Sequence, residues 1–227
     1  MPSPWKVRLA RKKLLVLFVV TALGCGSLSR FDPVLKEEVE RPKILPAVGW
    51  GGVLPSGSFR AQAPERITIL HTRSTPPAGA DLVAYMKALQ QKDVQRGWGD
   101  LGAHYYIDPA GAIYQSRRIV LKGRMKEEKR LDPDGHVLVM LIGDYSTLPL
   151  SEPFQEKFIA LVGWLLQHHA IPLENLRGLS DYIRTDSPGR NVSEWMKSPE
   201  FEIRLKEHLG IPLEVPTPTP AGTVDSE

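Results

Sequence analysis

The strongest constraint on the fold is the alternation of strand-like and helix-like segments between residues 65 and 212. Residues 67–72 and 137–142 are β-rich or apolar runs of strand length, and the second is apolar enough to be covered on both faces. Residues 104–108 and 112–115 flank Pro109-Ala110-Gly111, which is typical of a hairpin turn. Helical spacing of apolar residues marks 80–92, 151–169 and 198–210. We therefore predict a single α/β domain in which helices flank a central mixed β-sheet.

The N-terminus has the features of an export signal. Five Lys and Arg residues, with no acidic residue, precede an apolar run over residues 14–23, which is too short to span a bilayer. The sequence Ala22-Leu23-Gly24-Cys25 resembles a lipobox, although Ala22 stands where that motif most often has Leu. The resemblance implies cleavage before Cys25 and lipidation of its thiol. An ordinary signal peptide with a chance cysteine, or a short signal anchor, is the alternative.

Removal of this signal changes the charge of the chain. The mature chain would keep 24 Lys and Arg against 26 Asp and Glu, although the full sequence has a net charge of +3. A slightly acidic chain has no basic footprint for nucleic acid, so we expect no nucleic-acid partner. Cys25 is the one cysteine. Its lipidation would leave no thiol for a disulfide, and the fold would then depend on its hydrophobic core.

The composition divides the chain into four parts. Residues 1–24 form the predicted signal peptide, and residues 25–64 the lipidated cysteine and a proline- and glycine-rich tether. Residues 65–212 form the predicted domain, and residues 213–227 a Pro/Thr-rich tail expected to be disordered. The predicted location is the bacterial cell envelope, with the membrane reached through the lipid anchor.

Three segments of the predicted domain carry a family resemblance. They are the strand ending at His71, the segment Gly97-Trp98-Gly99-Asp100-Leu101-Gly102-Ala103 with its hairpin, and the segment Gly178-Leu179-Ser180-Asp181 that continues to Thr185, Ser187 and Gly189. Together they resemble the zinc N-acetylmuramoyl-L-alanine amidases, of the type shared with peptidoglycan recognition proteins and phage lysozyme amidases. The resemblance covers roughly residues 64–210 and implies the amidase fold.

The resemblance also implies a zinc site. In the family, two His and a thiolate or carboxylate hold Zn²⁺, which activates water for cleavage of the bond between muramic acid and L-alanine. His71 falls on the first ligand position, Leu179 on the second and Ser187 on the third. A catalytic tyrosine falls on Ala103, and Thr185 keeps a position near the oxyanion.

These substitutions remove the chemistry that the family uses. Leu179 has no lone pair, the hydroxyl of Ser187 is a weak zinc ligand, and Ala103 lacks a transition-state contact worth roughly 100- to 1,000-fold in rate. We expect no zinc, no other cofactor and no amidase activity. A metal site rebuilt from His71 with Asp144, Asp181 or Asp186 is the alternative.

The remaining polar residues have weaker functional signals. His71, Trp98, Asp181 and Thr185 are candidates for a retained binding groove, whereas His104, His168, His169 and His208 have structural interpretations. Trp98 and Asp100 are expected to shape a turn more than to contact a ligand. Residues 119–135 lack the His-Ala pair of the family, and their charge run at 124–130 is either a solvated loop or a contact for an acidic stem peptide.

Three functional hypotheses follow. The first is an envelope lipoprotein that binds peptidoglycan or a muropeptide without cleaving it. The second is a scaffold lipoprotein whose groove receives an envelope protein, which predicts an exposed apolar patch at Leu179 and Ala103. The third is an active amidase with rearranged metal ligands.

Overall fold

The structure is a computed structural model that describes residues 38–213; the predicted signal peptide, Cys25 and residues 214–227 lie outside the described part of the chain. The elements of this part, in chain order, are β1 (Ile44–Leu45), β2 (Arg66–His71), α1 (Leu82–Gln95), β3 (Tyr105–Ile107), β4 (Ile113–Gln115), β5 (His136–Leu141), α2 (Glu152–His168), the 3-10 helix η1 (Leu173–Asn175), β6 (Leu176–Gly178), the 3-10 helix η2 (Leu179–Asp181), α3 (Arg190–Met196) and α4 (Pro199–His208).

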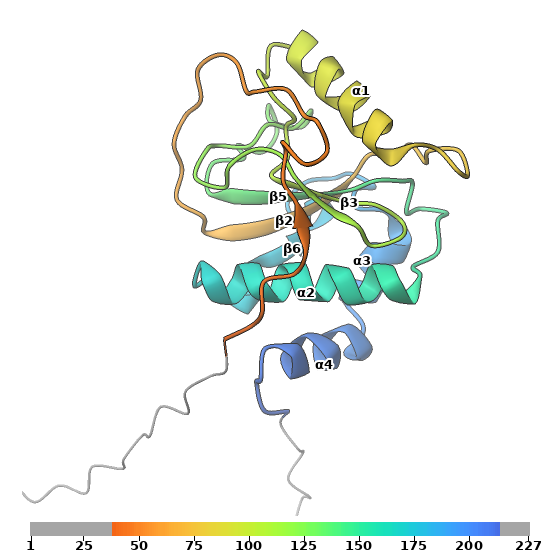
Figure 1. Cartoon of the computed structure of the whole chain (residues 1–227). Coiled ribbons are helices and arrows are strands. Elements are labelled where there is room, and N and C mark those ends of the chain that lie inside the picture. Colours follow the sequence, from red (N-terminus) through yellow and green to blue (C-terminus); the bar gives the residue numbers. More distant parts are fainter. Residues whose placement is uncertain (1–37, 214–227) are drawn as a thin grey trace, which may run out of the picture. The chain divides into compact units, whose positions relative to one another are not determined.

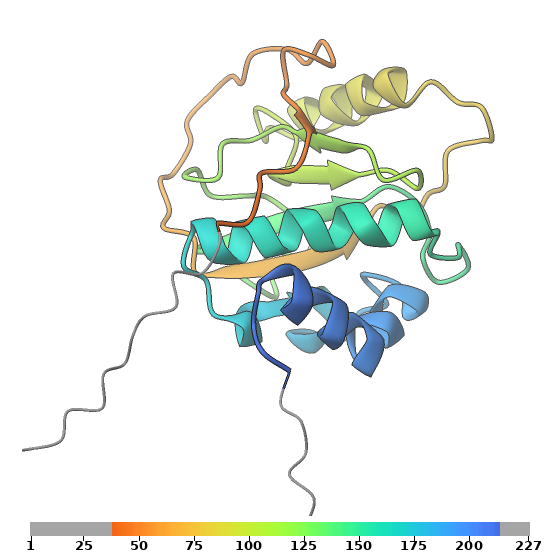
Figure 2. The same ribbon diagram turned by 60° about the horizontal axis from the view of Figure 1, so that its bottom comes forward.

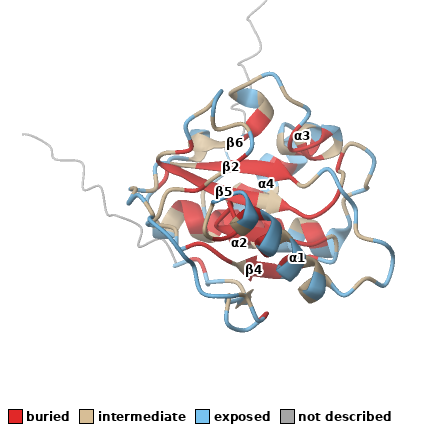
Figure 3. Cartoon of the chain, turned by 90° about the horizontal axis from the view of Figure 1, so that it is seen from above, coloured by how far each residue is buried: buried red, intermediate tan, exposed pale blue. Residues whose placement is uncertain are grey.

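The strands form one mixed six-stranded sheet in the order β1-β4-β3-β5-β2-β6. Strands β3 and β4 pair antiparallel as the predicted hairpin, and every other neighbouring pair is parallel. The long strands β2 and β5 both have a neighbour on each side, and Figure 3 shows their residues buried. The predicted α/β class and the mixed sheet are confirmed.

Helices cover both faces of this sheet (Figures 1 and 2). Because side chains of a strand alternate between faces, Ile67 and Ile69 of β2 pack in the core cluster that contains α2, α3 and α4 residues. Leu70 packs in a second cluster, on the opposite face, that contains Met86 of α1. The second face carries the cavity described below.

Local sequence signals set the helix ends. The Asp81 carboxylate accepts hydrogen bonds from the backbone N–H groups of Val83 and Ala84, at 2.9 and 3.1 Å, and so caps α1. Ser151 caps α2 and Ser198 caps α4 in the same way, each with a proline in the first turn. None of the helices within residues 38–213 is long and apolar enough to cross a membrane.

The structure corrects the predicted boundary at residue 64. Residues 38–64, assigned above to the tether, pack on the domain: β1 adds a parallel strand to β4, and Trp50 is buried. The side chain of Gln62 donates to the carbonyl of Ile119 at 2.9 Å and accepts from the N–H of Gly135 at 3.2 Å. A strand of two residues and single contacts such as those of Trp50 and Gln62 leave no hydrophobic periodicity in the sequence. The proline- and glycine-rich composition of this segment therefore suggested a spacer.

Candidate functional site

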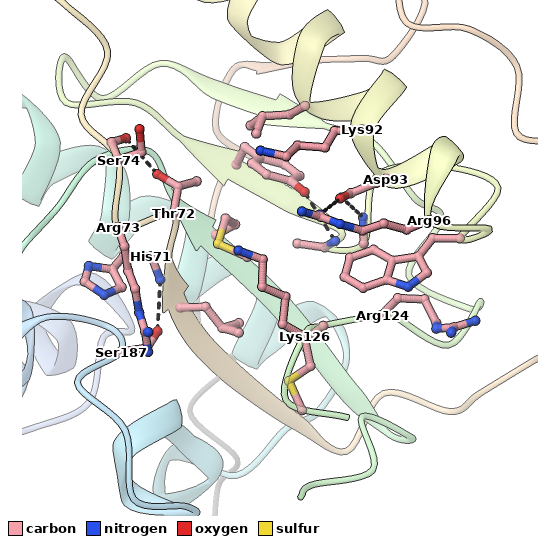
Figure 4. Close-up of a pocket in the computed structure, with 18 of the residues that line it drawn as sticks. His71, Thr72, Arg73, Ser74, Lys92, Asp93, Arg96, Arg124, Lys126 and Ser187 are labelled. Carbon is pink, nitrogen blue, oxygen red and sulfur yellow. Dashed lines mark hydrogen bonds and ion pairs between the residues drawn. The ribbon is translucent and has the colours of Figure 1, made fainter. Parts of the chain in front are cut away.

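A cavity of about 320 Å³ opens on the α1 face of the sheet (Figure 4). The end of β2, the helix α1, the turn before β3 and the loop after β4 all contribute to its lining. Its size is at the lower end of the range for sites that hold small ligands. This cavity contains most of the positions to which the family resemblance pointed.

Two of the positions where the resemblance places zinc-site groups, Ala103 and Leu179, lie in an apolar cluster beside the cavity. Leu70, Ala103 and Leu179 belong to one buried cluster, and both Ala103 and Leu179 are completely buried. Leu70 and Ala103 also line the cavity, together with Met125 and Met140. We call the lining residues Leu70, Ala103, Met125 and Met140 the apolar floor; Leu179 packs in the same buried cluster but does not line the cavity. The apolar floor offers no nitrogen or carboxylate oxygen for a metal or a reacting group.

His71 does not face this floor. It lines the cavity at the end of β2, but it follows Leu70 on the strand, and its ring is turned toward the segment after β5, where its Nδ1 accepts a 3.2 Å hydrogen bond from the backbone N–H of Tyr145. Figure 4 shows the imidazole of His71 pointing away from Lys92 and Asp93. The residue of β2 that faces Ala103 and Leu179 is therefore Leu70.

The hydrogen bond to Nδ1 also sets the chemistry of His71. Its side chain is fully buried, and burial lowers the pKa of the imidazole despite the opposing effects of Asp144 and Asp186. A neutral imidazole that accepts at Nδ1 carries its proton on Nε2. That Nε2 is buried and has no hydrogen-bond partner in the described part of the chain. In this tautomer, His71 has no free lone pair for a metal or for a base-catalysed step.

The other predicted site residues fall into two groups. Ser187 lines the cavity, where its Oγ accepts from the backbone N–H of His71 at 3.1 Å, and Trp98 also lines it. Thr185 and Asp181 are outside the lining. Thr185 Oγ1 accepts from the guanidinium of Arg73 at 2.7 Å, and Asp181 accepts from the N–H of Gly178 while pairing with Lys197.

These donor sets do not fit a zinc ion. A catalytic zinc site uses three protein ligands, and the family positions here supply an aliphatic side chain, a hydroxyl and an imidazole whose lone pair is engaged. The carboxylate nearest to His71 belongs to Asp144, 3.9 Å from Nδ1, and it caps its own turn by accepting from Ser146. Within residues 38–213, no group of three or more His, Cys, Asp or Glu side chains is placed to hold a metal ion.

A cationic wall stands beside the apolar floor. The cavity lining holds five cationic side chains and two acidic ones, namely Arg73, Lys92, Arg96, Arg124 and Lys126 against Asp93 and Glu127. The sequence analysis left Lys92 and Arg96 unassigned and offered two interpretations of the charge run at 124–130. Only the fold brings the end of α1 and the loop after β4 to the same cavity.

Trp98 lies between two cations of this wall. The guanidinium carbons of Arg96 and Arg124 lie 5.5 and 5.8 Å from the centroid of its ring, within the range of a cation–π contact. The Trp98 side chain also lines a second cavity, with Phe59 and Arg117. Trp98 therefore presents a flat aromatic surface to the cavity in addition to shaping its turn.

Two buried groups complete the cavity wall. Asp93 accepts from the N–H of Gly102 at 3.2 Å and pairs with Arg96, yet burial raises the pKa of its carboxyl. The hydroxyl of Tyr106 accepts from the N–H of Ala103 at 3.4 Å, and burial raises its pKa. The carboxyl of Asp93 is thus engaged by Arg96, and the hydroxyl of Tyr106 carries no charge at neutral pH.

The remaining buried histidines support the fold. His104 is completely buried; its Nδ1 accepts from the N–H of Leu138 and its Nε2 bonds the carbonyl of Leu121, both at 2.8 Å. His136 lies at the start of β5, whereas His71 ends its parallel neighbour β2, so the two lie at opposite ends of the paired strands. Burial lowers the pKa of both His104 and His136 to about 4.

Comparison with known proteins gives a consistent picture. No protein-family model matches the chain. A curated relative, peptidoglycan-recognition protein LB of Drosophila melanogaster, is 25% identical over 192 residues, which are 78% of this chain and 82% of the relative. The structure of Drosophila peptidoglycan recognition protein SD matches 70% of this chain and 96% of its own length, with a TM-score of 0.61 and 20% identity. The fold is that of peptidoglycan recognition proteins and amidases.

Two further structures extend this likeness. An endolysin N-acetylmuramoyl-L-alanine amidase from Clostridium intestinale URNW matches 77% of this chain and 99% of its own length, with a TM-score of 0.58 and 21% identity. The ectodomain complex of peptidoglycan recognition proteins LCa and LCx, solved with tracheal cytotoxin bound, matches 69% of this chain and 96% of the compared chain, with a TM-score of 0.57 and 22% identity. The resemblance found in the sequence motifs is thus confirmed at the level of the fold.

Proposed function

We propose that this chain is a cell-envelope lipoprotein whose amidase-like domain binds peptidoglycan or a muropeptide without cleaving it. The observation that carries the proposal is the pairing of a ligand-sized cavity with an apolar floor at the catalytic positions. A cavity with a cationic wall and an aromatic surface suits an anionic glycopeptide. The peptidoglycan recognition proteins named above share this fold, and one such complex was solved with tracheal cytotoxin bound.

Binding without cleavage is tested by two assays on the same purified protein. We expect it to sediment with purified sacculi and to produce no clearing in a zymogram, with or without added zinc. The control is a variant in which Trp98 and Lys126 are both changed to alanine, which should lose retention while its circular dichroism is unchanged. Equal retention of the control would refute binding through this cavity, and clearing that requires zinc would refute the inactive state.

The two alternatives gain less support from the geometry. A protein-binding scaffold predicts an exposed apolar patch at Leu179 and Ala103, but both residues are completely buried. A rearranged metal site would need partners for His71, and Asp144, 3.9 Å from its Nδ1, is engaged in its own turn. Metal analysis of the purified protein addresses the second alternative directly.

Localisation in the cell envelope is part of the same proposal. It rests on the lipobox-like sequence before Cys25, which lies outside the described residues. Expression in a bacterial host should give a membrane-bound form in which mass spectrometry finds acyl chains on Cys25. A Cys25→Ser variant should be released from the membrane fraction, and its retention there would contradict lipidation as the anchor.

A further inference from the structure

One loop carries most of the exposed apolar side chains of the domain. Residues 44–59 contain no charged residue. Within them, Val48, Val53 and Leu54 are 84%, 59% and 89% exposed. Of the seven large apolar side chains that are exposed in the described part of the chain, four lie in residues 45–54. Single exposed apolar residues are ordinary, whereas a cluster of this kind marks an interaction surface.

The fold holds this segment, residues 46–55, in one shape, and we call it the apolar loop. Backbone hydrogen bonds within it close a turn. The ring of Trp50 is buried, and its Nε1 donates to the carbonyl of Gln115 at 2.8 Å. The backbone of Val53 makes two hydrogen bonds to the side chain of Gln90, at 2.9 and 3.0 Å. The exposed side chains therefore project from an ordered platform, so a contact through them costs little further ordering.

The apolar loop and the cavity lie on opposite sides of α1. Figure 1 shows the orange segment that precedes β2 running beside this helix. The loop packs on the side that carries Lys87 and Gln90, whereas Tyr85, Ala88 and Lys92 line the cavity. With about 3.6 residues per turn, these two sets of side chains point in opposite directions. A surface that covers the apolar loop therefore leaves the cavity open.

The length of chain after Cys25 limits how far the domain can stand from a lipid on that residue. Because residues 38–64 pack on the domain, the described structure begins 13 positions after Cys25. Thirteen residues span at most about 45 Å, and the ten steps from residue 38 to Val48 span at most about 35 Å. The chain is thus long enough for the apolar loop to reach the bilayer that holds the anchor, and too short for the domain to leave its vicinity.

The charge and the size of the loop favour a lipid surface over a protein partner. Lys43 precedes the loop, and Lys87 lies beside Gly51 within it. Anionic lipid headgroups attract such lysines while apolar side chains enter between the headgroups. Four aliphatic side chains offer less than the roughly 800 Å² per partner of a stable protein interface. A bilayer needs no such area, because an anchor on Cys25 already holds the domain beside it.

We propose that the apolar loop rests on the lipid surface in which Cys25 is anchored, so that the domain is held with its cavity open. This inference rests on the proposed function, because the bilayer is the one that holds the lipid on Cys25. The exposed side chains of Val48, Val53 and Leu54 make the contact, and Lys43 and Lys87 strengthen it on anionic lipid.

The test places a tryptophan reporter in the apolar loop. The full chain, expressed in a bacterial host and purified from the membrane fraction, is reconstituted in vesicles of phosphatidylethanolamine and phosphatidylglycerol, with or without bromine on the acyl chains. Brominated lipid should quench the added tryptophan of Leu54→Trp roughly twofold more than that of Ile203→Trp, because apolar groups of interfacial segments enter about 5–10 Å into the headgroup and acyl boundary. Ile203, an exposed apolar residue of α4, is the matched position outside the loop. The fluorescence of the chain without an added tryptophan is subtracted in each case.

A second pair of variants tests the neighbouring side chains. Adding Val48→Asp and Val53→Asp to Leu54→Trp should lower the quenching to the level of Ile203→Trp, because the carboxylates are repelled by anionic headgroups and do not enter the bilayer. Adding Val120→Asp, at an exposed valine outside the loop, should leave the quenching of Leu54→Trp unchanged. Thermal unfolding of all variants should match the unmodified chain, since the substituted side chains are exposed.

The outcomes separate the two proposals. Equal quenching of Leu54→Trp and Ile203→Trp, in a chain that the vesicles retain, would overturn the lipid contact and leave the lipoprotein proposal intact; a loop that pairs two copies of the chain would give this result. Quenching that persists after both aspartates are added would overturn the assignment to this loop. A chain that is released from the membrane and carries no acyl group on Cys25 would overturn the proposed anchor and this inference with it.

Discussion

Placing a histidine at position 179 would test the orientation of His71. Leu179 is completely buried among apolar side chains. The Leu179→His variant would lose about 1.5–3 kcal/mol of apolar burial. It would also bury an unpartnered imidazole N–H at a cost of about 1–3 kcal/mol. We expect the free energy of unfolding to fall by about 3–5 kcal/mol, a large share of the 5–15 kcal/mol typical of a domain.

The effect of added zinc on the unfolding midpoint tests whether His71 and a histidine at position 179 share a face. If His71 faces away from Leu179, the single variant has no zinc site, and added zinc leaves its unfolding midpoint unchanged. The Leu70→His/Leu179→His/Ser187→Cys variant places three ligands on the cavity face. It should be stabilised by about 2.7 kcal/mol when the free zinc concentration is one hundred times its dissociation constant.

Denaturant unfolding with zinc or with a chelator measures both variants. The matched control adds His71→Ala to the triple variant, and the zinc response should survive because His71 is not a ligand. The reasoning is refuted if zinc stabilises Leu179→His alone and this effect disappears when His71 is also changed to alanine. That result would place the imidazole of His71 on the cavity face.

Three further predictions concern acid stability, the N-terminal segment and the aromatic surface. His104 has a folded-state pKa of about 4, below its unfolded value of about 6.5. The unfolded chain therefore binds more protons than the folded chain between these two pH values. The unfolding free energy should fall by up to about 3 kcal/mol as the pH drops from about 6.5 to about 4. In the His104→Asn variant, denaturant unfolding at several pH values should show a weaker dependence of the unfolding free energy on pH. Gln62→Ala removes the bonds to Ile119 and Gly135, so hydrogen exchange should speed up in residues 58–62 while the amides of β5 stay protected. Trp98→Ala should weaken the binding of a muropeptide about tenfold in calorimetry, whereas Trp164→Phe, on α2, should leave this binding unchanged. An equal effect of the two changes would contradict the role of Trp98.

Several elements were predictable because their signals are local. Asp81, Ser151 and Ser198 cap the helices that the sequence pattern predicts, and the hairpin forms around Pro109-Ala110-Gly111. Hydrophobic periodicity is enough for such segments because each one buries its own apolar face. The strands β1 and β6 and the short helix α3 have two, three and seven residues, too few to leave a period, and were missed.

At the candidate site, too, some features follow from the sequence and others only from the tertiary structure. The sequence alone determined the substitutions at Ala103, Leu179 and Ser187, since the absence of a ligand atom is a property of the side chain. The tertiary structure decided that Leu70, and not His71, shares a face with Leu179, because sheet packing fixes which alternate residues of β2 point to each side. It also decided that Lys92 and Lys126 meet in one cavity, because contacts between distant segments depend on how the chain is folded back on itself.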